Sequence, residues 1–152
     1  NKNESDAEAI SLLGALYGIQ VAMNPGLGAS LGSQNIALTS EALGIAPNNP
    51  RVLLQKGISK FSSPEFVGGS KTESLKYFSK SVKAFEIHMQ KEEEIDWGYL
   101  EALAWLGIAN SSLEDYQSAI TAYKKALKVE PDFARVKYDL LPKAEEKLTS
   151  SK

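Results

Sequence analysis

The sequence contains no cysteine and only one histidine, His88. Disulfides, thiolate metal sites and cysteine nucleophiles are therefore excluded. A zinc or dinuclear metal site normally needs several His or Cys ligands, so we expect no metal. The carboxylates are numerous, but nothing in the sequence pairs two of them on a substrate. These features predict a protein that is not an enzyme and needs no cofactor.

The sequence also has no large excess of charge of one sign and no long run of apolar residues. The 17 Lys and Arg residues are spread along the chain and are balanced by 19 Asp and Glu, for a net charge of −2. An overall positive field that would favour nucleic acid is absent, so we expect no nucleic-acid partner. No stretch approaches the roughly 18 apolar residues of a membrane span, so this segment is not expected to insert into a membrane. The acidic run 92–96 lacks the ligand spacing of a calcium loop and is interpreted as a solvated linker.

The chain begins NKNESDAEAI, without an initiator Met and without an apolar signal segment. This start indicates a processed or trimmed end. We expect a further segment before residue 1. The location is left open, with a bacterial extracytoplasmic or periplasmic one favoured.

Helix-length segments with apolar residues at helical spacing dominate what is present, and no segment alternates like a strand for long. Asn24-Pro25-Gly26 and the PNNP run at 47–50 are breaks, and Pro50 suits the first turn of a helix. The helices are predicted at about 5–23, 30–45, 50–61, from 71 past 88, 97–112, 114–129 and from 132 onward.

The segment 100–133 carries small and apolar residues at a fixed spacing. They are Leu103, Leu106, Gly107, Ala119, Tyr123, Ala126 and Pro131. This spacing resembles that of the tetratricopeptide (TPR) repeat, W-x₂-L-G-x₂-Y…A-x₃-F…P. Leu103 stands in the Trp position, Asn110 in the Tyr position and Tyr123 in the Phe position. Gly107 and Ala119 are small enough for two helices to approach closely, and Tyr123 fills the space between hairpins.

The same signature recurs upstream in weaker form, around Gly14 and around Gly57. Each of these two hairpins carries about five extra residues between its helices. The resemblance therefore implies an all-α, right-handed TPR-like superhelix of three hairpins, of a bacterial type with lengthened loops. We expect a single domain over 1–152, with hairpins at about 5–45, 50–94 and 97–130 and a capping helix at about 132–148. Three repeats are about the number that closes a continuous core.

The stretch SSPEFVGGSKTES at 62–74 resembles a phosphate-binding loop at first sight. Ser70 separates Gly69 from Lys71, however, and no strand precedes, so the P-loop pattern fails in spacing and in context. Ser70-x-x-Glu73 is instead a capping box for the next helix. The P-E-F-V-G-G string also resembles a loop of some bacterial TPR-like proteins. We interpret this stretch as a structural connector.

The resemblance implies that the first helix of each hairpin lines a concave, partner-binding face. The side chains expected there are Ala15, Ile19, Arg51, Leu54, Ile58, Phe61, Glu101, Ala104 and Ile108. The chaperone-binding branch of the family holds a terminal carboxylate with Lys, Asn and Arg. By spacing, those positions are occupied here by Ser11, Ala15, Gln55, Glu101 and Trp105, of which only Gln55 could serve. Ile58 and Ile108 could also be ordinary core residues.

Two functions follow as expectations. The first is a non-catalytic adaptor or scaffold that binds a protein or peptide on the concave face, through apolar contact. The alternative is a small-ligand-binding accessory protein, in which the lengthened loops close over a pocket at one end of the array. An open groove would favour the first function, and an enclosed cavity would favour the second.

Overall fold

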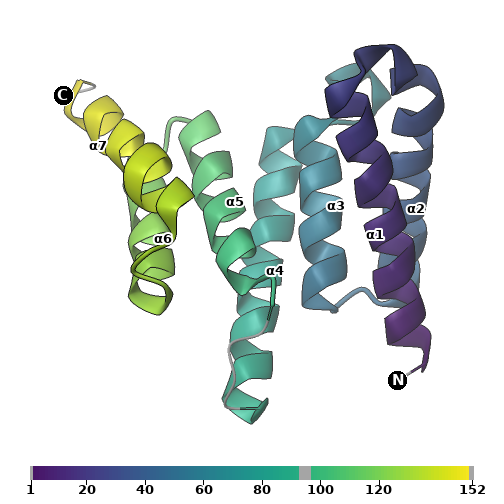
Figure 1. Cartoon of the computed structure of the whole chain (residues 1–152), viewed down its shortest axis with the longest axis horizontal. Coiled ribbons are helices and arrows are strands. Elements are labelled where there is room, and N and C mark those ends of the chain that lie inside the picture. The colour runs from purple at the N-terminus through teal and green to yellow at the C-terminus, as the bar shows by residue number, and fades with distance from the viewer. Residues whose placement is uncertain (1, 93–96, 151–152) are drawn as a thin grey trace. The chain divides into compact units, whose positions relative to one another are not determined.

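The computed structural model describes residues 2–92 and 97–150, and all regular structure in these ranges is helical. Seven α-helices follow one another along the described chain, as the sequence predicts (Figure 1). They are α1 (Lys2–Met23), α2 (Ser33–Ile45), α3 (Pro50–Ser62), α4 (Lys71–Glu92), α5 (Tyr99–Ser112), α6 (Tyr116–Val129) and α7 (Leu141–Ser150). The acidic linker predicted at 92–96 falls, apart from Glu92, outside the described residues.

The chain divides into two compact units, Asn1–Ala84 and Phe85–Lys152, which are described separately here. Unit 1 holds α1, α2, α3 and the first part of α4. Unit 2 holds the last turns of α4 together with α5, α6 and α7. A single domain over 1–152 stays a prediction.

The starts of several helices are fixed by side chains that accept hydrogen bonds from free backbone N–H groups. Asn49 Oδ1 accepts from Arg51 N at 2.9 Å and from Val52 N at 3.1 Å, so Pro50 can occupy the first turn of α3. Asp115 Oδ1 accepts from Ser118 N at the start of α6. Ser70 Oγ accepts from Glu73 N at 3.2 Å, which confirms the predicted cap of α4.

Only half of the predicted capping box forms at α4. The Glu73 carboxylate pairs with Lys60 Nζ at 2.6 Å instead of turning back to Ser70 N, which donates to Lys60 O at 2.8 Å. Gly69 N donates to Pro64 O, and a Cβ on Gly69 would lie 1.8 Å from Ser63 O. The connection 63–70 therefore packs tightly on its own hairpin, as the sequence predicts for a structural connector.

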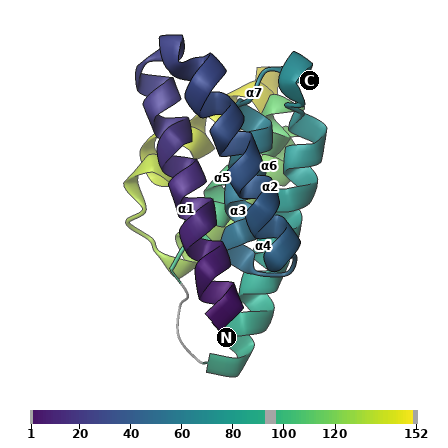
Figure 2. The ribbon, with the colours of Figure 1, turned by 90° about the vertical axis from the view of Figure 1, so that its right-hand side faces the viewer.

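Unit 1 is held together by small side chains between closely spaced helices. Figure 2 shows α1 running alongside α2. The buried cluster consists of Ala7, Ala42, Ala46 and Val52, with Ile10 and Leu43 packed against it. A Cβ on Gly57 would lie 2.5 Å from Phe78 Cε1. The absence of a side chain at Gly57 therefore lets the Phe78 ring of α4 pack directly on the backbone of α3.

Asn35 of α2 joins three helices of unit 1 through buried hydrogen bonds. Its Nδ2 donates to Gly14 O of α1 at 2.8 Å, and its Oδ1 accepts from Ser59 Oγ of α3 at 2.6 Å. Gly18 leaves the room for this amide, because a Cβ there would lie 3.1 Å from Asn35 Nδ2. The sequence pattern gives no sign of this polar link between apolar helix faces.

Unit 2 repeats the contact between a glycine and an aromatic ring. A Cβ on Gly107 would lie 2.1 Å from Tyr123 Cε1, which places α6 directly against α5. Phe85 and Tyr99 pack with ring centroids 6.1 Å apart. The Tyr99 hydroxyl donates to Glu86 Oε1 at 3.0 Å, and burial, with that hydrogen bond, raises the tyrosine pKa.

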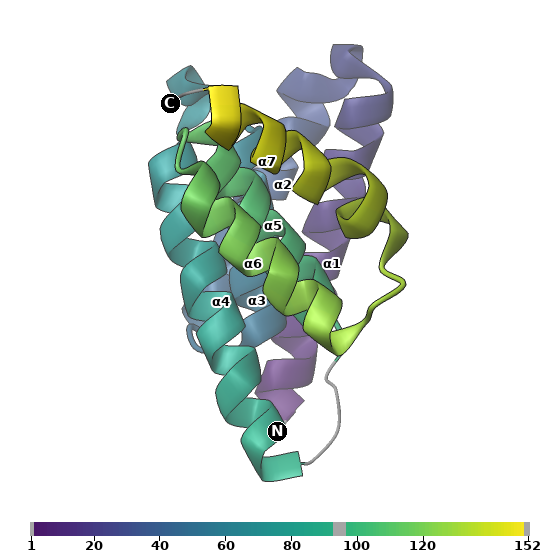
Figure 3. The same cartoon turned by 90° about the vertical axis from the view of Figure 1, so that its left-hand side faces the viewer.

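The C-terminal segment is helical from 134 to 150, and Figure 3 shows α7 beside α6. Its turns over Val136–Leu140 are π-helical, and the regular α-helix begins only at Leu141. Pro142 lies next in the sequence and has no N–H to donate to the preceding turn. Widened π turns are a common way for a helix to accommodate such a break in its hydrogen-bond ladder.

Candidate functional site

Each first helix of a hairpin carries a strip of partly buried and exposed residues that keeps a constant register to the helix glycine. On α3 the strip consists of Arg51, Gln55, Ile58 and Ser62. These residues lie six and two positions before Gly57 and one and five positions after it. On α5 the same positions around Gly107 are Glu101, Trp105, Ile108 and Ser112. On α1, counted from Gly14, they are Glu8, Leu12, Ala15 and Ile19.

Exposed apolar side chains on α1 form a surface that overlaps this strip at Leu12 and Ile19. Leu12 and Leu16 are each 51% exposed, Ile19 is 55% exposed and Met23 is 82% exposed. Their spacing of four, three and four residues places them on one face of the helix. The opposite face carries Ala7 and Gly14, which pack in the core. We call the four exposed residues the α1 stripe.

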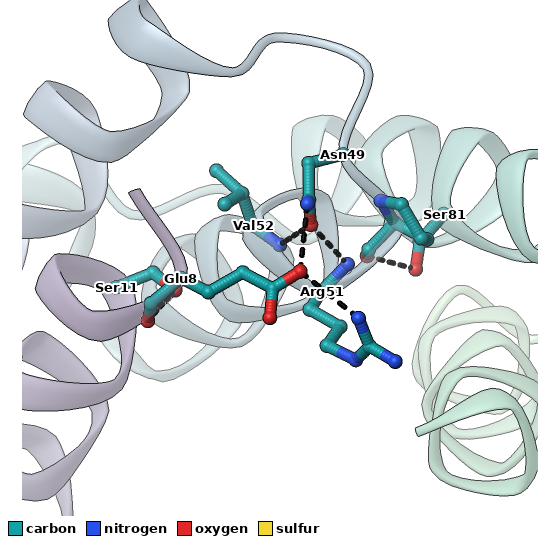
Figure 4. A network of polar contacts seen from close by, with 7 residues as sticks. Glu8, Ser11, Asn49, Arg51, Val52 and Ser81 are labelled. Carbon is teal, nitrogen blue, oxygen red and sulfur yellow. Dashed lines mark hydrogen bonds and ion pairs between the residues drawn. The ribbon is translucent and has the colours of Figure 1, made fainter. Parts of the chain in front are cut away.

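A polar cluster fixes α3 beside the start of this surface (Figure 4). Glu8 Oε1 accepts from Arg51 Nη1 at 2.9 Å and from Asn49 Nδ2 at 2.8 Å. Ser81 Oγ of α4 donates to Pro50 O at 2.7 Å in the same region. Arg51 thus joins α3 to α1 through its Nη1 group.

The structure places the nine predicted partner-binding residues in three kinds of environment. Ile19 and Glu101 are exposed. Five are partly buried: Ala15, Arg51, Ile58, Phe61 and Ile108. Leu54 and Ala104 are buried, at 2% and 1% exposed, and offer almost no surface to a partner. The face assigned from the sequence is thus rotated slightly toward the core.

Sequence reasoning left the residue two positions before each glycine out of the predicted contact face, although Gln55 and Trp105 were considered as positions of a carboxylate clamp. These residues are Leu12, Gln55 and Trp105, and the first is half exposed. Leu54, one residue away from Gln55, is 2% exposed and belongs to the packed side of α3. The glycine itself is the sequence signal that could have located the strip. It marks the packed face of the helix, and the strip residues lie about a third of a turn or more around the helix axis from it. Trp105 Nε1 lies 3.4 Å from Glu101 Oε1 on the strip of α5.

The titratable side chains do not form a catalytic cluster on these strips. Lys56, whose pKa is lowered by burial and then by Lys60, lies on the buried side of α3 and donates to Ser40 Oγ at 2.7 Å. Among the described residues, no group of three or more His, Asp or Glu side chains is arranged to hold a metal ion. Within the same residues, no helix combines the length and the apolar character needed to cross a bilayer.

The segment Gly28–Gly32 reads G-x-S-x-G, the sequence of a hydrolase nucleophile elbow. That motif needs a sharp turn from a strand into a helix, whereas here it forms a π-helical turn that leads into α2. The Ser30 hydroxyl donates to Leu27 O at 3.2 Å. The sequence is therefore present without the backbone geometry that the chemistry needs.

Comparison with known proteins agrees with this architecture. Residues 100–133 match the family model described as tetratricopeptide repeat. No curated protein matches the chain by sequence. The solved structure of the first TPR domain of the human RPAP3 protein is similar, with a TM-score of 0.60 and 18% identity, over 95% of this chain and 93% of that one.

Two further solved structures are also TPR domains. The Sgt2 TPR domain from Aspergillus fumigatus gives a TM-score of 0.58 with 21% identity, over 96% of this chain and 81% of that one. The Arabidopsis OM64 TPR domain gives 0.54 with 18% identity, over 99% of each chain. Residues 100–133 thus match a TPR repeat, and the helical fold of the described residues is similar to that of TPR domains, so the resemblance inferred from the sequence is confirmed.

Proposed function

We infer that this protein is a non-catalytic adaptor that binds a protein or peptide partner on first helices of its hairpins, with the α1 stripe of unit 1 as the main contact surface. The observation that carries this inference is the α1 stripe, which leaves Leu12, Leu16, Ile19 and Met23 largely in contact with water. Single exposed apolar residues are normal, but a continuous apolar surface on a soluble protein usually marks an interaction site. TPR domains generally serve as non-catalytic adaptors, which supports the same function.

The stripe favours a partner with an apolar face of its own. Four apolar side chains at helical spacing offer no charge to a carboxylate or a phosphate. Arg51, the nearest cation of the predicted face, is already paired with Glu8. An amphipathic helix, or an extended segment with alternating apolar residues, would therefore gain most by covering the stripe. Ile58, partly buried on helix α3, would extend this contact surface. Leu54 is buried and would contribute by packing within α3's own unit, without touching the partner.

The proposal is tested by selecting binders from a library of random displayed peptides and measuring their affinities by calorimetry. We expect the selected peptides to be rich in apolar and aromatic residues. Ile19→Glu and Leu16→Glu should each weaken binding by about tenfold or more, because each places a charge in a contact that excludes water. Both residues are more than half exposed, so the variants are expected to fold.

Leu13→Glu is the matched control for these variants. Leu13 lies on the same helix with a similar exposure of 43%, but outside the stripe, about 60° around the helix axis from Leu16, the nearest stripe residue. Its replacement should leave the peptide affinity within about twofold. Loss of binding in Leu13→Glu together with normal binding in Ile19→Glu would assign the partner to another face and contradict the proposal.

A further inference from the structure

The two lengthened connections of unit 1 meet around a cavity of about 770 Å³. One wall comes from the end of α1, the turns over 25–32 and the start of α2, and the other comes from residues 62–67. All lining residues belong to unit 1. The volume falls within the roughly 300–1,000 Å³ range of small-molecule sites.

The walls of this cavity, which we call the loop cavity, are mostly apolar. Val21, Ile36, Phe66 and Val67 supply side chains, and none of the residues that line the cavity is ionisable. The buried polar group in the wall is already engaged, because the Asn35 amide bonds Gly14 O and Ser59 Oγ. Ser33 Oγ likewise donates to Ser30 O at 2.8 Å. Ordered water needs two to four polar partners, and these walls offer few.

Glycines keep the loop cavity open. A Cβ on Gly32 would meet no atom within 4 Å, and a Cβ on Gly28 would meet only Val21 Cγ1, at 4.0 Å. This is the reverse of Gly57, where a Cβ would strike a packed ring. The space at Gly32 therefore does not serve the packing of one helix on another.

The mouth of the loop cavity carries an exposed aromatic ring on a tightly bonded segment. Phe66 is 89% exposed and Val67 is 45% exposed. Both precede Gly68, which has φ of 91°, and Gly69, which is held against Ser63 and Pro64. Lys60 Nζ also donates to Gly68 O at 2.9 Å. These contacts hold the backbone at Phe66 in place, while the ring itself remains exposed to water.

From the volume, the apolar walls and the ring at the mouth, we propose that the loop cavity binds an uncharged apolar ligand, such as the hydrocarbon chain of an amphiphile. The ligand chain would lie against Val21 and Ile36, with its polar end outside the mouth. Phe66 and Val67 would then lose their contact with water to the bound chain. The α1 stripe lies outside the lining residues, so this site is separate from the proposed adaptor surface.

The first test uses N-phenyl-1-naphthylamine, an uncharged dye whose fluorescence rises in apolar surroundings. We expect one molecule to bind per chain and to be displaced by dodecan-1-ol. Gly32→Leu should raise the dissociation constant of the dye by about tenfold or more, because its side chain would fill the open space. Gly44→Leu is the matched control, since Gly44 lies on α2, also has open space at its Cβ and does not line the cavity. That variant should bind as the unchanged protein does.

Phe66→Ser provides a second variant that does not depend on filling the interior. The exposed ring supports no core packing, so the fold should persist while dye affinity falls several-fold. Methyl NMR of Val21, Ile36 and Val67 during titration with dodecan-1-ol should show shifts confined to these residues. Saturable binding that is unchanged in both Gly32→Leu and Phe66→Ser, or no binding at all, would overturn the proposal. Displacement of the dye by the peptides selected for the α1 stripe would also overturn it, because the cavity would then belong to the partner surface.

Discussion

The hairpins α3–α4 and α5–α6 place an aromatic ring on a glycine in the same way, but they connect their helices differently. Gly57 faces Phe78 in the first hairpin, and Gly107 faces Tyr123 in the second. The connection spans 63–70 in the first and only 113–115 in the second. The contact that holds the two helices together is thus independent of the length of the loop between them. Unit 1 uses the additional residues to surround a cavity, and the short turn of unit 2 has no residues to do so.

The largest expected effect comes from adding one methyl group at each of these glycines. Gly107→Ala should lower the free energy of unfolding by about 3 kcal/mol, and Gly57→Ala by about 2 kcal/mol, because the ring must move or the helices must separate. The Cβ would lie 2.1 Å from Tyr123 in the first case and 2.5 Å from Phe78 in the second, hence the order. Urea unfolding followed by circular dichroism measures both values.

Gly44→Ala is the control for these two substitutions. Its Cβ would meet no atom within 4 Å on an exposed part of α2, so this change should stabilise the protein by about 0.5–1 kcal/mol through lower backbone entropy in the unfolded chain. If all three alanines behaved alike, the close contact between glycine and ring would not be the feature that the two hairpins share.

A smaller difference is expected between the buried asparagines of the two units. Asn35 bonds groups on two other helices, whereas Asn110 Nδ2 donates only to Leu106 O on its own helix, at 3.0 Å. Asn35→Ala should cost about 2 kcal/mol, because it leaves Gly14 O and the Ser59 hydroxyl buried without that partner. Asn110→Ala should cost about 1 kcal/mol or less. Equal losses in urea unfolding would show that the link between three helices has no special importance in unit 1.

Effects of about this smaller size are expected at the helix caps, Ser70 in unit 1 and Asp115 in unit 2. Either residue changed to alanine should cost about 1 kcal/mol at neutral pH. The backbone hydrogen bond from Ser118 lowers the pKa of Asp115 below its ordinary value of 3.8. The contribution of the Asp115 carboxylate to the free energy of unfolding is therefore fully present above about pH 4. It is lost as the pH falls through the lower pKa of the folded state.

The pH dependence separates the two caps. The cost of Asp115→Ala should shrink at low pH, because the protonated carboxyl no longer accepts as strongly from Ser118 N. The cost of Ser70→Ala should stay constant, since a hydroxyl does not titrate in this range. Measuring unfolding of both variants and of the unchanged protein at neutral pH and near pH 3 tests this; a constant cost for Asp115→Ala would refute it.

Much of the fold could be predicted because its signals are local. Pro50 and the asparagine before it define the start of α3, and Ser70 defines the start of α4, since a cap needs only residues two or three positions apart. The glycines and rings at repeat spacing likewise predict which helices pair. The π turns before Pro142 depart only slightly from the expected helix.

The sequence by itself therefore determined the number and class of the helices and the small-residue contacts between paired helices. It could not assign the open face of α1, because apolar residues such as Ile10, Leu13 and Ile19 lie on several sides of that helix. Only the packing of α2 and α3 decides which of them are covered. The loop cavity was likewise beyond a reading of the sequence. Its walls come from segments about thirty residues apart, and their separation in space is fixed by tertiary contacts such as Asn35 with Ser59.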